Sequence, residues 1–277
     1  MTVLPKLVFA LPLSLVASPL VKPALHQWHF TLGSQAEGGS YRSISHHQSG
    51  VAGTASDITG GLVGLGLSQS AGYGRWFYFQ TMESAAVSLG TSIVEDDTRG
   101  QDVRASSSIF IDLDGRAYFP LALSNRHAIT LLPNVGFAAH FFTMNAKETF
   151  NTGRVSRSFK RYQSKTYGPL IGLALGMDVT EQFSFRFNMA FEFPRYEGRS
   201  KQDFDSSTLS DWESLRMHRV ALHSRLDVSY QLRELLSLTG AIDYLQYGVL
   251  DRVGDQHNPT IGFLSRTKFS CGVRWQW

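Results

Sequence analysis

The sequence predicts an all-β fold, a transmembrane up-and-down antiparallel β-barrel of about ten strands, and three observations support this prediction. Apolar and polar residues alternate with a period of two along much of the chain, as in strands whose two faces meet different environments. Only 18% of the 277 residues are charged, against about 25% in soluble proteins. The mean hydropathy of −0.12 is nevertheless too polar for a bundle of membrane helices, and no stretch after the first 25 residues approaches the roughly 18 apolar residues that such a helix needs.

The composition excludes several function classes. The 26 basic and 23 acidic side chains give a formal net charge of +3, which lacks the strong positive charge of a nucleic-acid-binding domain. Aromatic residues make up 12% of the chain, and this content together with the low charge excludes intrinsic disorder. Cys271 is the single cysteine, which excludes an intramolecular disulfide and a cysteine-cluster metal site. We expect no nucleic-acid partner, no metal and no cofactor.

The first residues have the features of a targeting segment. Lys6 is followed by an apolar run over residues 7–16 and by the small residues Ala17 and Ser18, which is the order of regions in a secretory signal peptide. We therefore predict a signal peptide over residues 1–24, with an uncertain cleavage site, and a transmembrane β-barrel domain over residues 25–277. The alternative, a short buried N-terminal helix, is disfavoured by four prolines in this segment.

The last fifteen residues show the alternation most clearly. One face of the predicted strand has Phe263, Ser265, Thr267, Phe269, Cys271, Val273, Trp275 and Trp277, and the other has Leu264, Arg266, Lys268, Ser270, Gly272, Arg274 and Gln276. The segment is well above the usual strand length of about 5–6 residues. A chain that ends on such an aromatic strand resembles bacterial outer-membrane β-barrels, in which this strand is an assembly signal. The resemblance implies location in the bacterial outer membrane and recognition by the barrel-assembly machinery.

Four upstream segments repeat the pattern. Their apolar faces consist of Ile109, Ile111, Leu113, Ala117 and Phe119; of Tyr167, Ile171, Leu173, Leu175, Met177 and Val179; of Phe183, Phe185, Phe187, Met189, Phe191 and Phe193; and of Leu222, Leu226, Val228 and Tyr230. Charged residues occupy the opposite faces, as in a transmembrane barrel with lipid outside and a polar interior. A soluble all-β protein, the alternative, would carry its charges outside on shorter strands.

The predicted strands are joined by connections of two lengths. Short turns are expected near residues 68–75, 122–126, 180–182 and 232–235, and longer polar loops near residues 45–56, 95–103, 146–163, 197–217 and 251–259. Outer-membrane barrels have short periplasmic turns, longer external loops and an even number of strands. The pattern therefore predicts about ten strands with both chain ends on the periplasmic side, and eight or twelve strands are alternatives. The first two strands, near residues 26–43 and 57–68, contain glycines that blur the alternation.

A barrel of this size has little free space inside. Inward side chains already fill a barrel of about eight strands, whereas open aqueous channels are typical of about 16–18. The charged residues expected inside have both signs and can pair: Arg104, Asp112, Asp114, Arg116, Arg186, Glu192, Arg225, Asp227, Lys268 and Arg274. We therefore expect a structural, surface-interaction or narrow-pore role and not that of a general porin.

Parts of the chain resemble the omptins, outer-membrane proteases of Gram-negative bacteria with about ten strands and tall external loops. The resemblance extends over residues 30–277. It is carried by the strand pair at 109–119 and 127–137, and by the sequence Tyr-Gly-Pro-Leu-Ile-Gly-Leu at 167–173, which leads into the strand at 183–193. It rests on pattern and spacing and includes no diagnostic motif. It implies an activated water held between an Asp pair and an Asp–His couple.

An omptin-like endopeptidase is therefore one alternative function. Asp96 and Asp97 stand where the resemblance places the Asp pair, at the start of the second long loop. Omptin pairs are separated by one residue and point the same way, whereas adjacent residues of a strand diverge. The fourth long loop contains aspartates, but the first histidine that follows is His218, and His257 is the other candidate imidazole.

A lipid hydrolase is the second alternative. His47 and Ser49 are two residues apart and would share a strand face, where the imidazole can deprotonate the hydroxyl. The pair resembles the His-x-Ser element of outer-membrane phospholipase A and of lipid A deacylases. Here no Asn or Glu that would orient the imidazole is identifiable, and residues 43–56 have the composition of a loop.

The third long loop is basic. We expect outer-membrane lipid around the barrel and lipopolysaccharide against this loop, because arginine pairs well with the phosphates of lipopolysaccharide. A solvated loop is the alternative. The expected contacts are Arg154, Arg157, Lys160 and Arg161. Trp28, Trp275 and Trp277 are expected in an aromatic girdle at the periplasmic interface.

Overall fold

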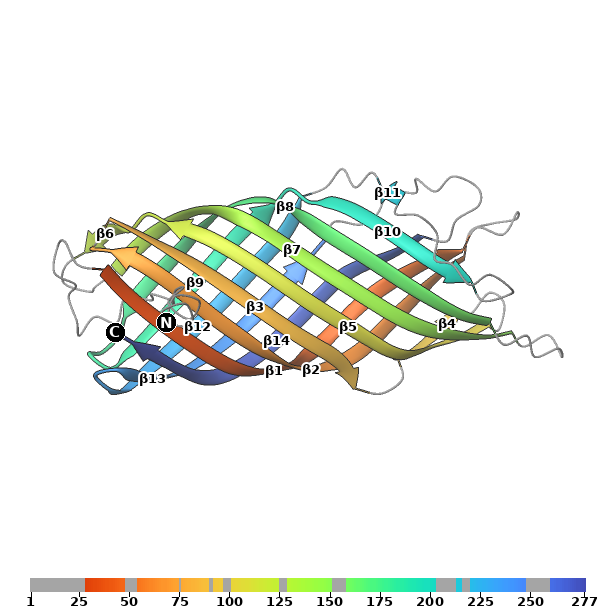
Figure 1. Cartoon of the computed structure of the whole chain (residues 1–277), viewed down its shortest axis with the longest axis horizontal. Helices are drawn as coiled ribbons and strands as arrows, with labels where there is room; N and C mark the ends of the chain where they lie inside the picture. Colours follow the sequence, from red (N-terminus) through yellow and green to blue (C-terminus); the bar gives the residue numbers. More distant parts are fainter. Residues whose placement is uncertain are drawn as a thin grey trace, which may run out of the picture.

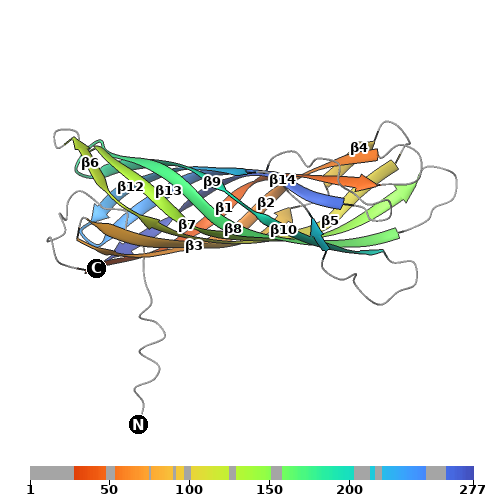
Figure 2. The ribbon, with the colours of Figure 1, turned by 90° about the horizontal axis from the view of Figure 1, so that it is seen from above.

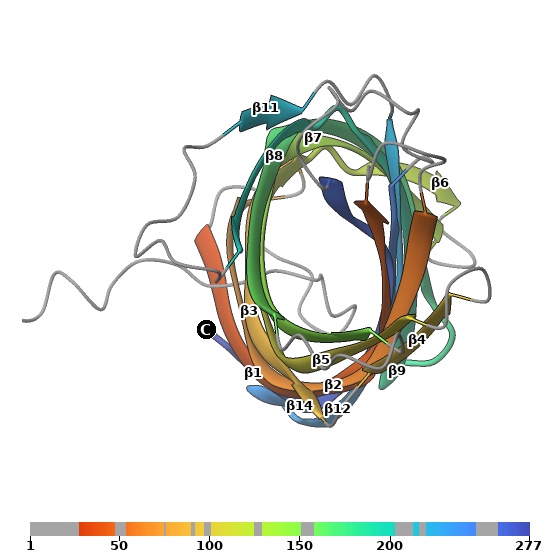
Figure 3. The ribbon, with the colours of Figure 1, turned by 90° about the vertical axis from the view of Figure 1, so that its right-hand side faces the viewer.

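The predicted fold is confirmed as a closed antiparallel β-barrel. The computed structural model describes residues 28–47, 54–74, 76–89, 92–96, 101–124, 129–150, 158–202, 213–215, 220–247 and 260–277. Ten strands form the ring: β1 (Trp28–His47), β2 (Thr54–Tyr73), β3 (Phe77–Leu89), β5 (Gln101–Tyr118), β7 (Ile129–Phe150), β8 (Ser158–Asp178), β9 (Phe183–Glu192), β12 (Ala221–Arg233), β13 (Leu236–Gln246) and β14 (Thr260–Gln276). Each pairs with the next ring strand in sequence, and β14 pairs with β1 to close the ring (Figure 3).

Four shorter strands extend the ring at its ends. β4 (Ser92–Asp96) pairs with β5, and β6 (Leu121–Ser124) pairs with β7. β10 (Arg195–Gln202) pairs with β8, and β11 (Glu213–Leu215) pairs with β10. β4 and β10 lie at the end of the barrel opposite to β6 and the C-terminus (Figures 1 and 2). We call the end with β4 and β10 the long-loop end, which is external in outer-membrane barrels. The described residues contain no helix that is long and apolar enough to cross a membrane.

The two faces of each strand meet different environments, as the alternation predicts. On β9, Phe187 and Phe191 are exposed on the outer surface, while Arg186 and Glu192 are buried inside the ring. On β14, Phe269 is 55% exposed, whereas the neighbouring Lys268 is 6% exposed. The apolar face therefore looks outward and the charged face looks into the lumen.

The outer apolar surface has the height of a bilayer core. It runs from Pro169 on β8 to Val179 just after this strand, and ten residues at about 3.3 Å each, tilted by about 40°, cover about 25 Å. An exposed aromatic rim follows at the short-turn end, formed by Trp28, Tyr73, Trp76, Trp275 and Trp277. It includes the three tryptophans expected in the girdle, and Trp28 packs on Tyr73 with ring centroids 5.3 Å apart.

The strands are longer than predicted, so several predicted loop boundaries are wrong. β2 continues through the predicted turn at 68–75, and the chain reverses at Gly74, whose φ is 57°. Ser68 and Ser70 have the composition of a turn, but they are buried against the polar lumen. β7 and β8 likewise extend into the predicted loop at 146–163. Strand segments beyond the apolar band have polar residues on both faces, so they lose the alternation that reveals a strand.

Candidate functional site

Buried side chains cross the lumen in three layers. The layer nearest the long-loop end, here the aromatic layer, consists of Tyr41, Leu62, Ala86, Phe110, Phe142, Met144, Ala221, Leu245 and Tyr247. The ring of Phe110 lies 4.9 Å from that of Tyr41 and 4.8 Å from that of Phe142 between centroids. Nearest the short-turn end is the tyrosine layer of Tyr78, Tyr118, Leu132 and Ala174. Charged residues fill the space between these two layers, and we call them the charged layer. The lumen is therefore filled, as predicted.

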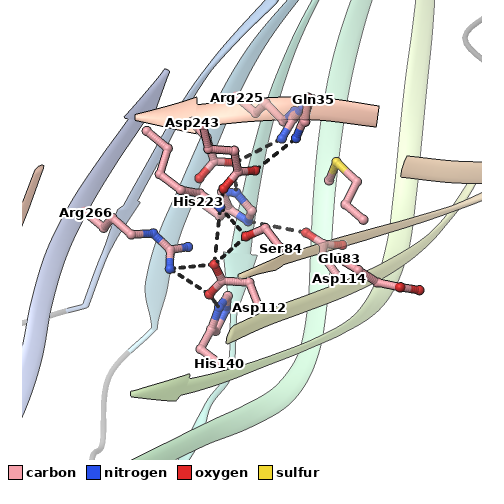
Figure 4. A pocket seen from close by; sticks show the side chains of 13 residues that line it. Gln35, Glu83, Ser84, Asp112, Asp114, His140, His223, Arg225, Asp243 and Arg266 are labelled. Carbon is pink, nitrogen blue, oxygen red and sulfur yellow. Dashed lines mark hydrogen bonds and ion pairs between the residues drawn. The ribbon is translucent and has the colours of Figure 1, made fainter. Parts of the chain in front are cut away.

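Asp112 on β5 is the centre of this charged layer (Figure 4). Arg266 Nη1 donates to its carboxylate at 2.7 Å, and His140 Nδ1 lies 2.8 Å from it. Lys268 Nζ donates at 3.2 Å and Ser84 Oγ at 3.0 Å. Lys268 also donates to Glu37 Oε2 on β1 at 3.1 Å. Side chains from β3, β7 and β14 therefore meet around the carboxylate on β5, and Lys268 connects this group to Glu37 on β1.

Imidazoles and carboxylates alternate across the lumen, starting from Asp112. His140 Nε2 lies 3.2 Å from Glu192 Oε2, and the other Glu192 oxygen lies 3.2 Å from His223 Nδ1. His223 Nε2 then lies 2.8 Å from Asp243 Oδ2. A neutral imidazole has only one N–H. Because both nitrogens of His140 face carboxylates, His140 is an imidazolium or one of those carboxylates carries the proton. We call these five groups the imidazole–carboxylate chain.

Arginine–aspartate pairs connect the charged layer to the tyrosine layer. Arg225 Nε donates to Asp227 Oδ1 at 2.8 Å, and Arg186 Nη2 donates to Asp227 Oδ2 at 3.0 Å. Arg186 Nη1 donates to the hydroxyl of Tyr78 at 3.0 Å. Asp227 therefore accepts from two guanidinium groups, one of which also holds the tyrosine layer in place.

The buried charges nearly cancel. The buried residues of the described strands include six carboxylates (Glu37, Asp112, Asp114, Glu192, Asp227 and Asp243) and five Lys or Arg (Arg116, Arg186, Arg225, Arg266 and Lys268). The proton that His140 shares with its two carboxylates supplies the remaining positive charge, whether the imidazole or a carboxylate carries it. A small polar cavity among these side chains has room for about one or two water molecules. It is too small for a peptide or an acyl chain, and the aromatic layer separates it from the long-loop end.

The ion pairing predicted for the lumen is confirmed, but five of its members were not among the ten residues predicted inside. Eight of the ten predicted residues are buried here, Arg274 is half-buried on the same face, and the side chain of Arg104 is outside the described part. Arg266 and His223 stand on the polar faces that the alternation predicts, although they were not named among the ten. Glu37, His140 and Asp243 were missed altogether. Each stands on the inward parity of its strand, so extending the alternation through β1, β7 and β13 would have placed them inside.

The predicted catalytic residues stay predictions. Asp96 ends β4, where its backbone pairs with Gln101, but its side chain is outside the described residues. Asp97, His218 and His257 are also outside them, as is Ser49 of the lipid-hydrolase alternative. His47 belongs to β1, which corrects the prediction that residues 43–56 are wholly loop. Among the described residues, no group of three or more His, Cys, Asp or Glu side chains has a metal-binding arrangement.

The four predicted lipopolysaccharide contacts are described only in part. Arg154 and Arg157 are outside the described residues, and Lys160 and Arg161 have described backbones within β8. Lys160 pairs in register with Ala146 and Gln202, and Arg161 with Asn145 and Lys201.

Comparison with known families identifies this kind of barrel. Residues 17–276 match the family described as Pom: Protochlamydia outer membrane protein. The chain belongs to this family. Its lipid-facing band and charged interior are therefore those of an integral β-barrel of the bacterial outer membrane, as the sequence predicts. No curated protein matches this Protochlamydia outer membrane protein family member.

Solved outer-membrane barrels are similar to this family member at low sequence identity. The outer membrane protease OmpT from Escherichia coli aligns over 90% of this chain and 95% of its own, with a TM-score of 0.51 and 9% identity. OprG from Pseudomonas aeruginosa aligns over 91% and 97%, with a TM-score of 0.43 and 9% identity. The expected resemblance to omptins is consistent with the first of these, and at such identity the likeness shows the fold alone.

Proposed function

We propose that the protein is a narrow ion pore of the outer membrane that is closed at rest by the charged layer. The observation that carries this proposal is that the lumen is crossed by many buried, mutually paired charges. If the lumen only had to be filled, apolar side chains would serve as well, because buried ion pairs contribute little net stability compared with apolar groups of similar volume. Charges in this position instead supply a polar path for ions.

Alternative pairings within the charged layer support a gate. Lys268 Nζ lies 3.1 Å from Glu37 and 3.2 Å from Asp112. Arg225 lies 2.8 Å from Asp227 and 3.5 Å from Asp243. Each cation can therefore shift toward its second carboxylate without becoming unpaired. Movement of this kind opens a polar path at a lower cost than breaking a pair outright.

The test is single-channel recording in planar bilayers with the refolded protein. We expect brief openings of small conductance for the wild type. Asp112→Asn keeps the shape but removes the central negative charge, so openings become more frequent and shift toward anion selectivity. Glu234→Ala, an exposed carboxylate at the β12–β13 turn, is the matched control and leaves openings unchanged. Silence from both the wild type and Asp112→Asn would overturn the proposal, and so would a continuously open wild type.

A surface-interaction role is the second candidate, because the strands extend well beyond the apolar band. β8 begins at Ser158, and its apolar outer surface begins only at Pro169, so about half of the strand stands above the membrane. Silent recordings would leave this role in place. The hydrolase alternatives have their own tests. Peptide cleavage that is lost in Asp97→Ala would favour the protease, and fatty-acid release that is lost in Ser49→Ala would favour the lipid hydrolase.

A further inference from the structure

A polar cluster on the outer surface of β8 and β10 directly follows the apolar band at the long-loop end. Lys165 Nζ lies 2.7 Å from Glu197 Oε2, and Arg195 Nε lies 3.3 Å from Glu197 Oε1. The hydroxyl of Tyr167 donates to the same carboxylate at 2.7 Å. The side chain of Arg195 is 63% exposed and that of Lys165 is 38% exposed. Two cations are therefore held around one carboxylate on the outside of the barrel.

The height of this cluster coincides with lipid headgroups. The last exposed residues of the apolar band here are Pro169 on β8 and Phe193, which directly follows β9. Arg195 is two residues beyond Phe193 in the chain, and Lys165 is four residues beyond Pro169 along β8 toward the long-loop end. At about 2.5 Å of height per tilted residue, they lie about 5–10 Å beyond the band edge. Headgroup regions add about 5–8 Å on each side of the hydrocarbon core, so both side chains stand in or just above the headgroup layer.

The strand register places further basic residues at positions of the same parity along β8 and β10. β8 and β10 pair so that Lys165 is opposite Glu197 and Arg161 is opposite Lys201. Every second residue on these strands shares the parity of Lys165. In residues 161–165 and 195–201 these positions are Arg161, Gln163, Lys165, Arg195, Glu197, Arg199 and Lys201, which include five Lys or Arg and one carboxylate. The other parity of residues 160–166 and 196–202 holds Lys160 as its one basic residue.

The opposite wall of the barrel has fewer basic residues at its described outward positions. β1 is five strands away from β8 in either direction around the ring. The described outward positions at the long-loop end of β1 and β14 are Ser40, Arg42, Ser265 and Thr267, with Arg42 as the one charged residue. The described outward positions of β1 and β14 therefore contain no counterpart of the cluster formed by Lys165, Glu197 and Arg195.

We propose that this sector of β8 and β10 binds the phosphate groups of a glycolipid in the outer leaflet, of the lipid A type. Lys165 and Arg195 are its centre, and Arg161, Arg199 and Lys201 occupy the register positions that share their parity. Phosphate is the anionic group that stands at this height in such a lipid, and guanidinium groups bind it with paired charge-assisted hydrogen bonds. The acyl chains would lie along the apolar band below, on Ile171 and Phe193. The sector is a refinement of the predicted lipopolysaccharide contacts, because it keeps Arg161 and excludes Lys160.

Glu197 has a defined part in this site. The hydrogen bond from Lys165, and next that from Tyr167, hold the pKa of the Glu197 carboxyl below its ordinary value. The carboxylate is therefore ionised at neutral pH and keeps both cations on the outer face. An arriving phosphate competes with Glu197 for these cations and brings more negative charge than one carboxylate.

The test measures lipid binding to the full-length barrel in nonionic detergent by native mass spectrometry, with bisphosphorylated lipid A and the same lipid after dephosphorylation as probes. We expect the wild type to prefer the phosphorylated lipid. Lys165→Gln with Arg195→Gln should lower its affinity by about tenfold or more, since each side chain loses a charge-assisted hydrogen bond. Arg42→Gln on the opposite wall is the matched control and should bind as the wild type does. Retention of the heat-modifiable band on SDS gels shows that each variant is folded.

A second pair of variants tests the parity argument. Arg161→Gln should weaken binding of the phosphorylated lipid, and Lys160→Gln should leave it unchanged. Equal binding of both lipids to the wild type would overturn the proposal, as would equal losses in Arg42→Gln and the double variant. If inorganic phosphate does not displace bound lipid A, the result supports a lipid site. Inorganic phosphate that alone stabilises the barrel as strongly as lipid A would show a free-anion site and refute the lipid assignment.

Discussion

Replacing Asp112 with alanine tests whether the charged layer organises the barrel. Asp112 is 7% exposed and contacts Arg266, His140 and Lys268 within 3.2 Å. After Asp112→Ala, His140 keeps Glu192 and Lys268 keeps Glu37. The surroundings nevertheless gain one uncompensated positive charge in a buried site.

The magnitude follows from that imbalance. Removing one partner of a buried ion pair costs about 3–5 kcal/mol, because the remaining charge stays desolvated. Ser84→Ala removes a neutral donor from the same carboxylate, and we expect it to cost about 1 kcal/mol. The double variant Asp112→Ala with Lys268→Ala removes one charge of each sign. It should therefore cost less than the sum of the two single variants, by about 1–3 kcal/mol.

Equilibrium unfolding in urea from lipid vesicles, followed by tryptophan fluorescence, measures these free energies. The denaturant dependence should stay constant among the variants, so that the midpoint reports stability alone. A loss below about 1 kcal/mol for Asp112→Ala would refute the reasoning, because Asp112 would then not compensate the surrounding cations. Strict additivity of the double variant would show that Asp112 and Lys268 are not coupled.

Three further predictions concern the wall and the lumen. Gly136→Ala should lower the free energy of unfolding in urea by about 1–3 kcal/mol, because the added Cβ would overlap the backbone of β5. Gly176→Ala is the control. Its Cβ would lie 3.6 Å from a leucine methyl, and its stability should stay within about 0.5 kcal/mol of the wild type. Phe142→Ala in the aromatic layer should cost about 3–5 kcal/mol through the cavity it leaves and should make channel openings more frequent, and unchanged values of both would contradict the filled lumen. Cys271 is exposed on the lipid-facing side of β14, so a sulfonated maleimide should label it slowly in vesicles and rapidly after unfolding; fast labelling of the folded protein would show that this face meets water.

The fold could be predicted because the alternation is a local property. Whether Phe187 faces lipid and Arg186 faces the lumen depends only on neighbouring residues of one strand. The ends of the strands could not be predicted in this way. Above the membrane, residues 160–164 are polar at both parities of the strand, so neither a period nor a loop signature distinguishes strand from loop there. The register with β7 and β10 continues through this segment in the structure.

The partners inside the lumen could not be predicted from local pattern. Lys268 and Glu37 are 231 residues apart in sequence and meet because β14 pairs with β1. His140 reaches Asp112 on the adjacent strand, but it reaches Glu192 only two strands away across β8. Such contacts depend on the stagger and tilt of the whole ring. The sequence indicates which charges are inside, whereas ring closure decides which of them pair.

The inward charges also fix the register of each strand, because they determine which of its two faces points into the lumen. A slip of one residue in any strand would exchange its two faces. On β9 it would turn Arg186 into lipid, and an arginine or lysine near the midplane of the membrane costs about 2–4 kcal/mol on the lipid face of a barrel. The same slip would bring Phe187 against Asp227, which would lose its partner Arg186. The cost of placing a charge in lipid thus determines which face of each strand points outward. The ion pairs across the lumen determine which residues of neighbouring strands lie side by side. An apolar filling of equal volume would supply neither constraint, so the polar interior favours this one register more strongly.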